Sequence, residues 1–352
     1  MIIKMNRKKT AVLFGGCSSE YGVSLQSAYS VLKGLNKEKL DIIPIGITEK
    51  GDWYRYNGDY SNIKNDAWES DRENLIPVAV SVSRGKKGLI ELDGNGSGPI
   101  DIDLAFPVLH GKNGEDGTVQ GLFELAGIDV VGCDSLSSAL CMDKHRAHAL
   151  VEAAGIKVPR SVLLKRPVTD EMRKKLSELS YPFFVKPVRA GSSYGVSKIK
   201  SVDELQAALS LAFRYDDEVL AEENIEGCEV GCAIMGTDGF IVGRVDEIEL
   251  EADFFDYTEK YTLKTSKIHM PARVDGLTEK RIQSTAVKIF ELLGCSGFAR
   301  VDMFLTPCGE IVFNEVNTIP GFTSHSRFPN MMKGIGLSFE AMLDKILEPY
   351  LK

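Results

Sequence analysis

The sequence predicts a protein of mixed α/β and α+β class, in which a parallel α/β domain precedes two α+β modules. Residues 8 to 132 alternate apolar strands with helices, and the remainder contains a glycine-rich loop and a strand-rich end. At 352 residues, the chain is too long for one typical hydrophobic core. We therefore expect three domains, at 1–132, 133–223 and 224–352.

The first domain is predicted from near-continuous apolar segments separated by helical ones. Strands that helices cover on both faces have this composition, which is typical of a parallel layer. The expected strands are 9–16, 40–48, 102–111 and 128–133, and the expected helices are 24–35 and 118–127. We expect a parallel sheet with helices against it.

The second and third modules contain strands of two different kinds. A helix is expected over 136–155, where a glycine provides a C-cap. The strand 181–188 leads into the loop "RAGSSYG", and a strand at 196–200, a helix at 202–215 and a strand at 218–223 follow. Alternating strands at 229–236 and 240–250, a polar segment, a helix at 278–293 and a hairpin at 300–317 complete the chain.

Composition excludes several classes of protein. The formal charge is −8 and the basic residues are dispersed, so neither a nucleic acid nor an anionic membrane is an expected partner. The apolar run near the start is too short for a signal peptide or a membrane span, so we expect a cytoplasmic protein. Seven cysteines without CxxC spacing favour reduced thiols over disulfides or zinc.

The hairpin "RVDMFLTPCGEIVFNEVN" concentrates charge on one face. Period-two alternation places Arg300, Asp302 and Phe304 on one face of the first strand, and Phe313, Glu315 and Asn317 on the matching face of the second. Carboxylates so close disfavour each other unless a cation lies between them. Hard oxygen ligands suit magnesium. The alternative is a solvated polar face on which Arg300 simply pairs with Asp302.

Two lysines and two glutamates form a candidate nucleotide site. Lys186 ends an apolar strand, where an ammonium needs an anion, and the loop after it offers backbone N–H groups to a phosphate. Lys144 lies on the expected helix before it, and Glu222 and Glu229 could bind an adenine amino group and ribose hydroxyls. The alternatives are a flexible turn and surface charge. Walker A and GxGxxG motifs are absent, which disfavours P-loop and nicotinamide enzymes.

Histidines give weaker signals. His110 lies at the carboxyl end of a strand, where α/β sheets place ligands, although a structural role is the alternative. His145 and His148 are three residues apart on the expected helix, and no third ligand is near them in sequence. We expect both to lie on the surface.

Together the motifs resemble the D-alanine–D-alanine ligase family of the ATP-grasp superfamily. The matching segments occur in family order over nearly the whole chain: "FGGCSSEYGVSLQSA", "HGKNGEDGTVQGLFELAG", "FFVKPVRAGSSYGVSK", "EKY", "GFARVDMF" and "FNEVNTIPGFTSHSRFPNM". The resemblance implies a three-domain ATP-grasp ligase, in which the N-terminal α/β (pre-ATP-grasp) domain precedes two α+β modules that hold ATP between their sheets. It also implies a role in peptidoglycan synthesis and, commonly, a homodimer.

The resemblance implies a role for each candidate residue. The residues expected to bind ATP are Lys144, Lys186, Ser193, Glu222, Glu229 and Lys260. Those expected to hold two Mg²⁺ ions, with Mn²⁺ as an alternative, are Asp302, Glu315 and Asn317. Those expected to bind D-alanine, close the loop over it or stabilise the oxyanion are Glu20, His110, Ser192, Tyr261, Arg300 and Gly321. The implied reaction passes through a D-alanyl phosphate.

Arg327 bears on the second substrate. It follows Ser326, at a position where D-alanine–D-alanine ligases are expected to carry leucine or methionine, and its donors suit the hydroxyl of D-serine. In this respect the chain resembles D-alanine–D-serine ligases of the VanG-like, glycopeptide-resistance type. We expect Arg327→Leu to favour D-alanine and leave ATP binding intact. D-lactate is disfavoured because "FFDYTEKY" keeps Lys260 and Tyr261.

Two alternatives to a D-serine ligase remain open. In the first, Arg327 is a surface residue paired with an acid, and the enzyme makes D-alanyl-D-alanine for ordinary cell-wall synthesis. In the second, the chain is a nucleotide-binding sensor that has lost catalysis. The second is disfavoured by an intact set of expected site residues: Glu20, Arg300, Asp302, Glu315 and Asn317.

Overall fold

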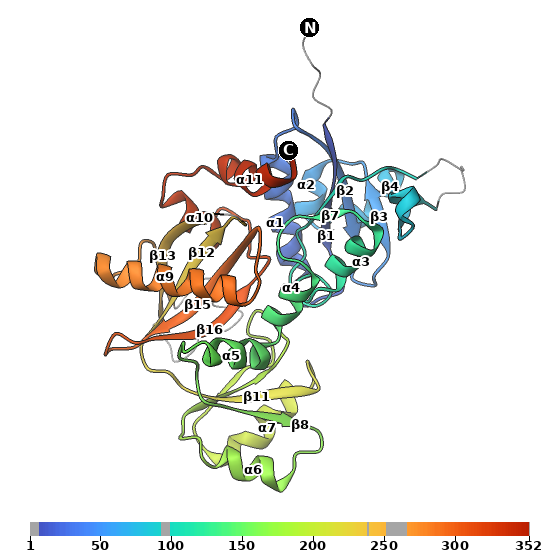
Figure 1. The fold of residues 1–352 in the computed structure, drawn as a ribbon. Coiled ribbons are helices and arrows are strands. Elements are labelled where there is room, and N and C mark those ends of the chain that lie inside the picture. Colours follow the sequence, from blue (N-terminus) through green and yellow to red (C-terminus); the bar gives the residue numbers. More distant parts are fainter. Residues whose placement is uncertain (1–6, 93–98, 238, 251–265, 352) are drawn as a thin grey trace.

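The computed structural model describes residues 7–92, 99–237, 239–250 and 266–351, which form three sheets and the helices packed on them (Figure 1). The first sheet has seven strands in the order β5-β4-β3-β2-β1-β6-β7. Its strands are β1 (Lys8–Gly15), β2 (Leu40–Ile47), β3 (Trp53–Tyr56), β4 (Leu75–Ser81), β5 (Gly88–Glu91), β6 (Leu104–Pro107) and β7 (Asp129–Val130). The helices of this region are α1 (Tyr21–Gly34), α2 (Tyr60–Lys64), α3 (Thr118–Ala126) and α4 (Ser135–Met142).

The centre of this sheet is parallel, as predicted. Strand β1 pairs in parallel with β2 and β6, and β6 pairs in parallel with β7. Strands β3, β4 and β5 extend the sheet in antiparallel order and were not predicted. These strands are short and mostly half-exposed, so they lack the apolar runs of the buried strands.

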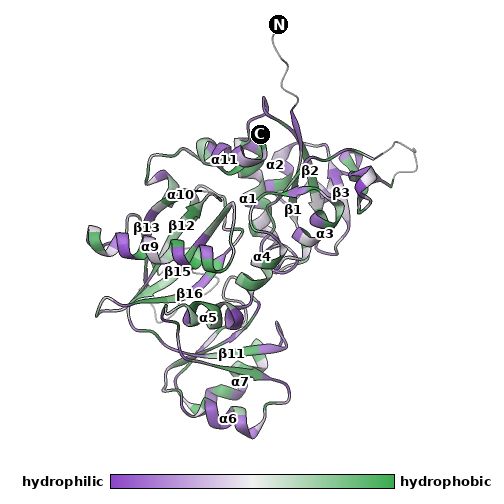
Figure 2. Ribbon diagram, viewed as in Figure 1, coloured by the Kyte–Doolittle hydropathy of each residue, from purple (hydrophilic) through white to green (hydrophobic). Residues whose placement is uncertain are grey.

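The second sheet is antiparallel, in the order β10-β9-β11-β8. Its strands are β8 (Ser161–Lys165), β9 (Phe183–Pro187), β10 (Ser197–Ile199) and β11 (Glu218–Glu223), and its helices are α5 (Lys144–Ala153), α6 (Asp170–Leu176) and α7 (Val202–Ala212). Figure 2 shows hydrophobic residues along α7 and a largely hydrophilic α6. The single helix expected over 136–155 is instead two, because extended Asp143 separates α4 from α5 and caps α5 through Arg146 N–H, 2.9 Å away.

The third sheet is also antiparallel, in the order β14-β13-β12-β15-β16. Its strands are β12 (Cys228–Met235), β13 (Ile241–Leu250), β14 (Ser266–His269), β15 (Phe298–Leu305) and β16 (Ile311–Asn317), and α9 (Gly276–Leu292) packs on one face. The predicted hairpin is confirmed, with Arg300 opposite Asn317 and Asp302 opposite Glu315.

One part of the hairpin prediction was wrong. A register shift after Asp302 places Phe313 opposite Met303, and Phe313 is fully buried in the core beneath α9 instead of lying on the face of Glu315. The shift leaves an additional residue, Asn314, on β16. A bulge of this kind reverses the alternation of side chains, which period-two reasoning cannot foresee.

The largest hydrophobic core joins the two ends of the chain. Residues of α1 pack with those of α10 (Arg327–Lys333) and α11 (Phe339–Leu347), and Phe106 of the first sheet contacts Phe298 and Phe322 edge-on at ring-centroid distances of 6.2 Å. This core holds the segment between β16 and α10 against the first sheet. Across the described ranges, none of the helices has both the length and the apolar character that a bilayer span requires. All seven cysteines are free thiols.

Candidate active site

A cavity of about 1290 Å³ lies where the three regions meet. Its walls come from the start of α1, the loop after β9, the end of the β15–β16 hairpin and the segment leading into α10. The predicted site residues that line it are Glu20, His110, Ser192, Arg300, Asn317, Gly321, Ser326 and Arg327. Residues far apart in the sequence therefore share one pocket.

Glu20 projects a carboxylate into this cavity from the N-terminus of α1. Its side chain is buried and accepts a hydrogen bond from the hydroxyl of Ser192, which lies in the loop after β9. A Cβ on Gly191 would approach Glu20 Oε2 to 2.6 Å, so glycine lets the loop come this close without displacing the carboxylate. Ser192 and Ser193 have φ of 47° and 59°, a left-handed conformation that bends the loop toward the carboxylate.

His110 ties the first sheet to the segment before α10. Its Nδ1 donates to Ile319 O at 2.8 Å, and its Nε2 lies 3.0 Å from the hydroxyl of Ser27, which also accepts from Phe322 N–H. Since a carbonyl only accepts, the proton lies on Nδ1 and Ser27 donates to Nε2. Burial lowers the pKa of His110 to about 4, so the imidazole is neutral and holds the loop in place.

Glu115 is a second carboxylate at this end of the cavity, and the sequence analysis missed it. It accepts from Gly111 N–H at 2.8 Å and from Ile319 N–H at 3.1 Å. Burial and the charge of Glu20 raise the pKa of Glu115 to about 8. The signal that could have found it is its place in the glycine-rich segment after β6, at the edge where such sheets bind ligands.

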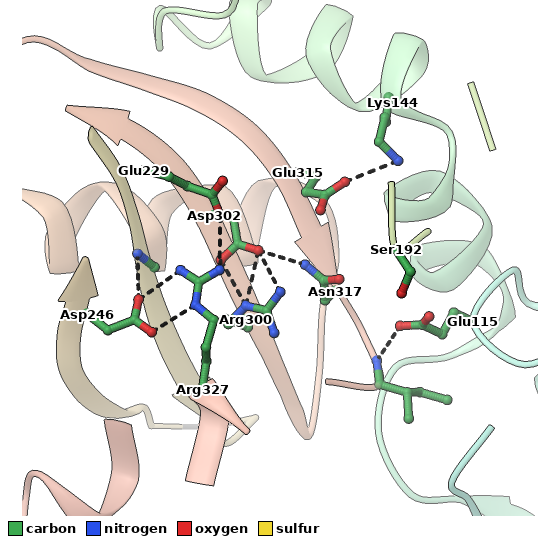
Figure 3. Close-up of polar contacts among 12 residues, drawn as sticks. Glu115, Lys144, Ser192, Glu229, Asp246, Arg300, Asp302, Glu315, Asn317 and Arg327 are labelled. Carbon is green, nitrogen blue, oxygen red and sulfur yellow. Dashed lines mark hydrogen bonds and ion pairs between the residues drawn. The ribbon is translucent and has the colours of Figure 1, made fainter. Parts of the chain in front are cut away.

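Asp302 occupies the centre of the hairpin cluster and is almost fully buried (Figure 3). The guanidinium of Arg300 donates to both of its oxygens, at 2.8 Å from Nε and 2.7 Å from Nη2. Asn317 Nδ2 adds a third donor at 3.0 Å. Arg300 does pair with Asp302, as the alternative reading supposed, but the pair is buried beside the cavity and not on a solvated face.

Arg327 starts α10 and lies among three carboxylates with its side chain only 10% exposed, which contradicts the reading of it as a surface residue (Figure 3). It donates to both oxygens of Asp246 at 2.8 Å and to Glu229 Oε1 at 3.0 Å. Its Nη1 also lies 3.2 Å from Asp302 Oδ1. Burial opposes its charge, but the carboxylates outweigh that effect and raise the pKa of Arg327.

Asp246, on β13, is the other residue that the sequence did not single out. It is fully buried and also accepts from Gly231 N–H at 3.1 Å. Within its strand, Asp246 is directly followed by Glu247, and Glu249 comes two residues later, so only the packing of β13 against β12 and α10 distinguishes it. No local sequence pattern could have identified it.

Lys144, the first residue of α5, connects the hairpin to the loop after β9. Its ammonium lies 3.1 Å from Glu315 Oε2 and donates to Ala190 O at 2.9 Å. A cation is thus placed between the predicted metal-binding hairpin and the predicted phosphate loop.

Lys186, on β9, pairs with an anion, as its position in an apolar strand predicts. It donates to Glu222 Oε1, on β11, at 2.6 Å, and both side chains are buried. Glu229 does not join Glu222, because it lies on β12 in the third sheet and contacts Arg327 instead. Lys260 and Tyr261 lie outside the described residues.

The expectation that His148 is a surface residue was wrong. Its side chain is 3% exposed and lies between the second and third sheets, with Nε2 2.7 Å from Asn314 O and Nδ1 3.7 Å from Glu222 Oε2. His145 is half-exposed on the same helix. A helix packed between two sheets buries more of its surface than the sequence of α5 suggested.

The hairpin offers side-chain oxygen atoms that could bind magnesium. Asp302 and Glu315 face each other across the β15–β16 pair, and the amide of Asn317 lies beside Asp302, which gives a set of hard oxygen atoms. Within the described ranges, no cluster of three or more histidines, cysteines and acids has the arrangement of a complete metal site. Carboxylate and amide oxygens are ligands that suit magnesium, which takes its remaining ligands from phosphate oxygens and water.

Comparisons with known proteins agree with this geometry. Residues 9–133 match the family described as "D-ala D-ala ligase N-terminus", and residues 150–348 match "D-ala D-ala ligase C-terminus". The vancomycin B-type resistance protein VanB of Enterococcus faecalis is 45% identical over 348 residues, covering 97% of this chain and 98% of that protein. The D-alanine–D-alanine ligase of Caldicellulosiruptor bescii is 42% identical, covering 97% and 95%.

A solved structure is more similar still. The VanG D-Ala:D-Ser ligase from Enterococcus faecalis shares 63% identity with this chain, with a TM-score of 0.92, and the match covers 98% of this chain and all of that one. The D-alanine–D-alanine ligase from Coxiella burnetii has a TM-score of 0.86 at 30% identity, covering 98% and 94%. The chain belongs to the D-alanine–D-alanine ligase family, the ATP-dependent enzymes of ATP-grasp fold that join D-amino acids by a peptide bond.

Proposed function

We propose that this enzyme joins D-alanine to D-serine, for peptidoglycan precursors with reduced affinity for vancomycin. The observation that carries the proposal is Arg327, a guanidinium at the cavity wall whose position three carboxylates fix. The similarity to the VanG D-Ala:D-Ser ligase supports the same substrate pair.

The hydroxyl of D-serine can accept a hydrogen bond, and Arg327 has an N–H group that could donate it. A guanidinium carries five N–H groups, one on Nε and two on each terminal nitrogen. Asp246 engages Nε and one N–H of Nη2, while Glu229 and Asp302 engage Nη1. No described residue accepts from the second N–H of Nη2. We assign this N–H to the D-serine hydroxyl, and D-alanine cannot use it.

The first half-reaction is assigned to the residues around Glu20. Its carboxylate pairs with the ammonium of the first D-alanine, and Ser192 keeps that carboxylate in place. The substrate carboxylate then attacks the γ-phosphorus of ATP, which gives D-alanyl phosphate and ADP. Lys144 and Lys186, with Ser193 of the loop, neutralise and position the phosphates.

The second half-reaction forms the peptide bond. The amine of D-serine attacks the acyl carbon, and the guanidinium of Arg300 and the backbone N–H of Gly321 stabilise the oxyanion. Inorganic phosphate leaves as the intermediate collapses. Closure of the loop after β9 over Glu20 keeps water away from the acyl phosphate.

Asp302, Glu315 and Asn317 would hold the two Mg²⁺ ions, which would supply positive charge to neutralise the phosphates of ATP. Arg300, Arg327 and Asn317 share the oxygens of Asp302. These contacts fix the position of the carboxylate and balance its charge.

D-alanine as second substrate is the other candidate. It is favoured by the small size of its side chain, which a pocket for D-serine also admits, and by relatives described as D-alanine–D-alanine ligases at about 40% identity. Some D-alanyl-D-alanine is therefore an expected by-product.

The test is phosphate release with ATP, Mg²⁺ and D-alanine, with and without an equal concentration of D-serine, and mass spectrometry of the dipeptides. We expect D-serine to accelerate phosphate release and D-alanyl-D-serine to predominate. Predominant D-alanyl-D-alanine would overturn the D-serine assignment and leave the ligase. ATP binding without turnover on any pair of D-amino acids would overturn both.

A further inference from the structure

Three buried side chains form a polar chain across the seam between the second and third sheets. Lys186 donates to Glu222 Oε1, Glu222 Oε2 faces His148 Nδ1, and His148 Nε2 contacts the carbonyl of Asn314 on β16. Helix α5, which carries His148, lies between β11 and β16 (Figure 1). The proposed reaction assigns no role to His148.

The hydrogen bonds fix which atom of His148 carries its proton. The Asn314 carbonyl can only accept, so Nε2 donates to it over 2.7 Å. Burial lowers the pKa of His148, so the ring is neutral and carries a single proton. Nδ1 is therefore a bare lone pair.

This lone pair faces another acceptor. Glu222 Oε2 is 3.7 Å from Nδ1, too far for a direct hydrogen bond, and neither atom has a hydrogen-bond partner. Both side chains are 96% or more buried. Two buried acceptors that face each other without a donor cost free energy, and one donor group with two N–H bonds placed between them would satisfy both.

We propose that His148 and Glu222 form an acceptor pair that selects the 6-amino group of adenine, which makes His148 a residue that sets nucleotide specificity. The inference rests on the proposed function only for the place of the nucleotide, between the two sheets. Adenine offers an amino group with two N–H bonds. Hypoxanthine and guanine offer a carbonyl oxygen there, which both acceptors would repel.

The same pair lies next to the hairpin that is expected to bind the metal ions. Because His148 is anchored on Asn314, the residue before Glu315, the base site and the metal-binding strand are linked through one side chain. Both acceptor atoms are covered, so the base reaches them only as the two sheets part to admit the nucleotide. The nucleotide would therefore contact α5 through His148, at the boundary between the second and third sheets.

Two variants separate recognition of the adenine amino group by His148 from its structural contact with Asn314. His148→Asn can keep an acceptor near the Nδ1 position but loses the anchor on Asn314, whereas His148→Gln can keep a donor to Asn314 but loses the acceptor facing Glu222. The matched control is His145→Gln, on the same helix. For each folded protein we would measure kcat and KM for ATP, inosine triphosphate and purine riboside triphosphate, together with equilibrium binding of each nucleotide.

We expect wild type to favour ATP over inosine triphosphate by roughly 100-fold or more in kcat/KM. His148→Gln should reduce that preference at least about tenfold through KM for ATP with kcat nearly unchanged, while His148→Asn and His145→Gln keep most of it. Purine riboside triphosphate, which lacks the amino group, should bind both His148 variants as it binds wild type.

If His148→Gln keeps the preference for ATP over inosine triphosphate, the inference is overturned. It is also overturned if His148→Asn loses as much of this preference as His148→Gln does, because His148 would then act only by supporting the fold. If His148→Gln weakens the binding of purine riboside triphosphate as much as that of ATP, the effect does not run through the amino group, and the inference is also overturned. If wild type binds ATP selectively but forms no dipeptide, the proposed function fails while equilibrium binding still decides the role of His148.

Discussion

At the scale of single residues, charge balance governs this site. Asp246 and Asp302 are at most 1% exposed. Asp246 pairs with the guanidinium of Arg327, and Asp302 pairs with those of Arg300 and Arg327. A buried carboxylate that loses its partner is far more costly than a paired one. The expectation that Arg327→Leu leaves ATP binding intact must therefore be revised, since Glu229 and Asp302 would lose a partner too.

We predict that Arg327→Leu lowers the free energy of unfolding by about 3–5 kcal/mol, because it leaves Asp246 unpaired in the interior. Chemical denaturation monitored by circular dichroism measures the change. The double variant Arg327→Leu/Asp246→Asn should recover much of the loss. A single variant as stable as wild type would show that solvent or other groups compensate the charge of Asp246.

Glu115 should make stability depend on pH. Its folded-state pKa of about 8 lies above the usual value of 4.5, so the folded protein binds more protons than the unfolded chain between these values. Its contribution to stability is then complete below about pH 4.5 and is lost as the pH rises toward 8. Unfolding free energies of wild type and Glu115→Gln from pH 5 to 8.5 should show a smaller negative slope in the variant, and parallel curves would refute this.

At the scale of elements, close approach of strands and helices creates the site. Gly231 of β12 lies under the Arg327 cluster, and a Cβ there would overlap the guanidinium and lie 2.8 Å from Asp246 Oδ1. Gly276, at the start of α9, has no atom within 4 Å of the position a Cβ would take. The two glycines form a natural comparison.

We predict that Gly231→Ala displaces Arg327 and lowers kcat/KM for D-serine by roughly 10- to 100-fold, since small misplacements of positioning groups are costly. Gly276→Ala should leave the rate constant unchanged. Steady-state kinetics at saturating D-alanine and ATP measure both. Equal rates in the two variants would mean that the strand yields without moving Arg327.

Elements also mark what the sequence could and could not predict. The parallel strands of the first sheet and the existence of the 300–317 hairpin follow from apolar runs and alternation. The need of Lys186 for an anion also follows from its apolar strand, but the sequence did not identify Glu222 as that anion. The bulge that buries Phe313, the break between α4 and α5 at Asp143 and the burial of His148 depend on packing between distant segments. Asp246 became recognisable only once β13 was placed beside Arg327.

At the scale of the whole molecule, three regions complete one site. The first region supplies Glu20 and His110 to the cavity, the second supplies Ser192, and the third supplies Arg300, Asn317 and Arg327. The shared core between α1 and the C-terminal helices fixes the segment that carries Gly321 and Ser326.

We predict that Glu315→Gln raises the Mg²⁺ concentration needed for half-maximal turnover, while unfolding free energy falls by only about 1–2 kcal/mol, because Lys144 keeps its bond to Ala190 O. Magnesium titrations of ADP formation, beside denaturation curves, measure the two effects. A variant with an unchanged magnesium requirement would remove Glu315 from the metal site.

The most direct test of the account is the ratio of dipeptides made at equal D-alanine and D-serine by wild type and by the charge-balanced Arg327→Met/Asp246→Asn variant, measured by mass spectrometry. We predict mainly D-alanyl-D-serine from wild type and mainly D-alanyl-D-alanine from the folded, ATP-binding variant. The same ratio from both would contradict the claim that the buried guanidinium chooses the second substrate.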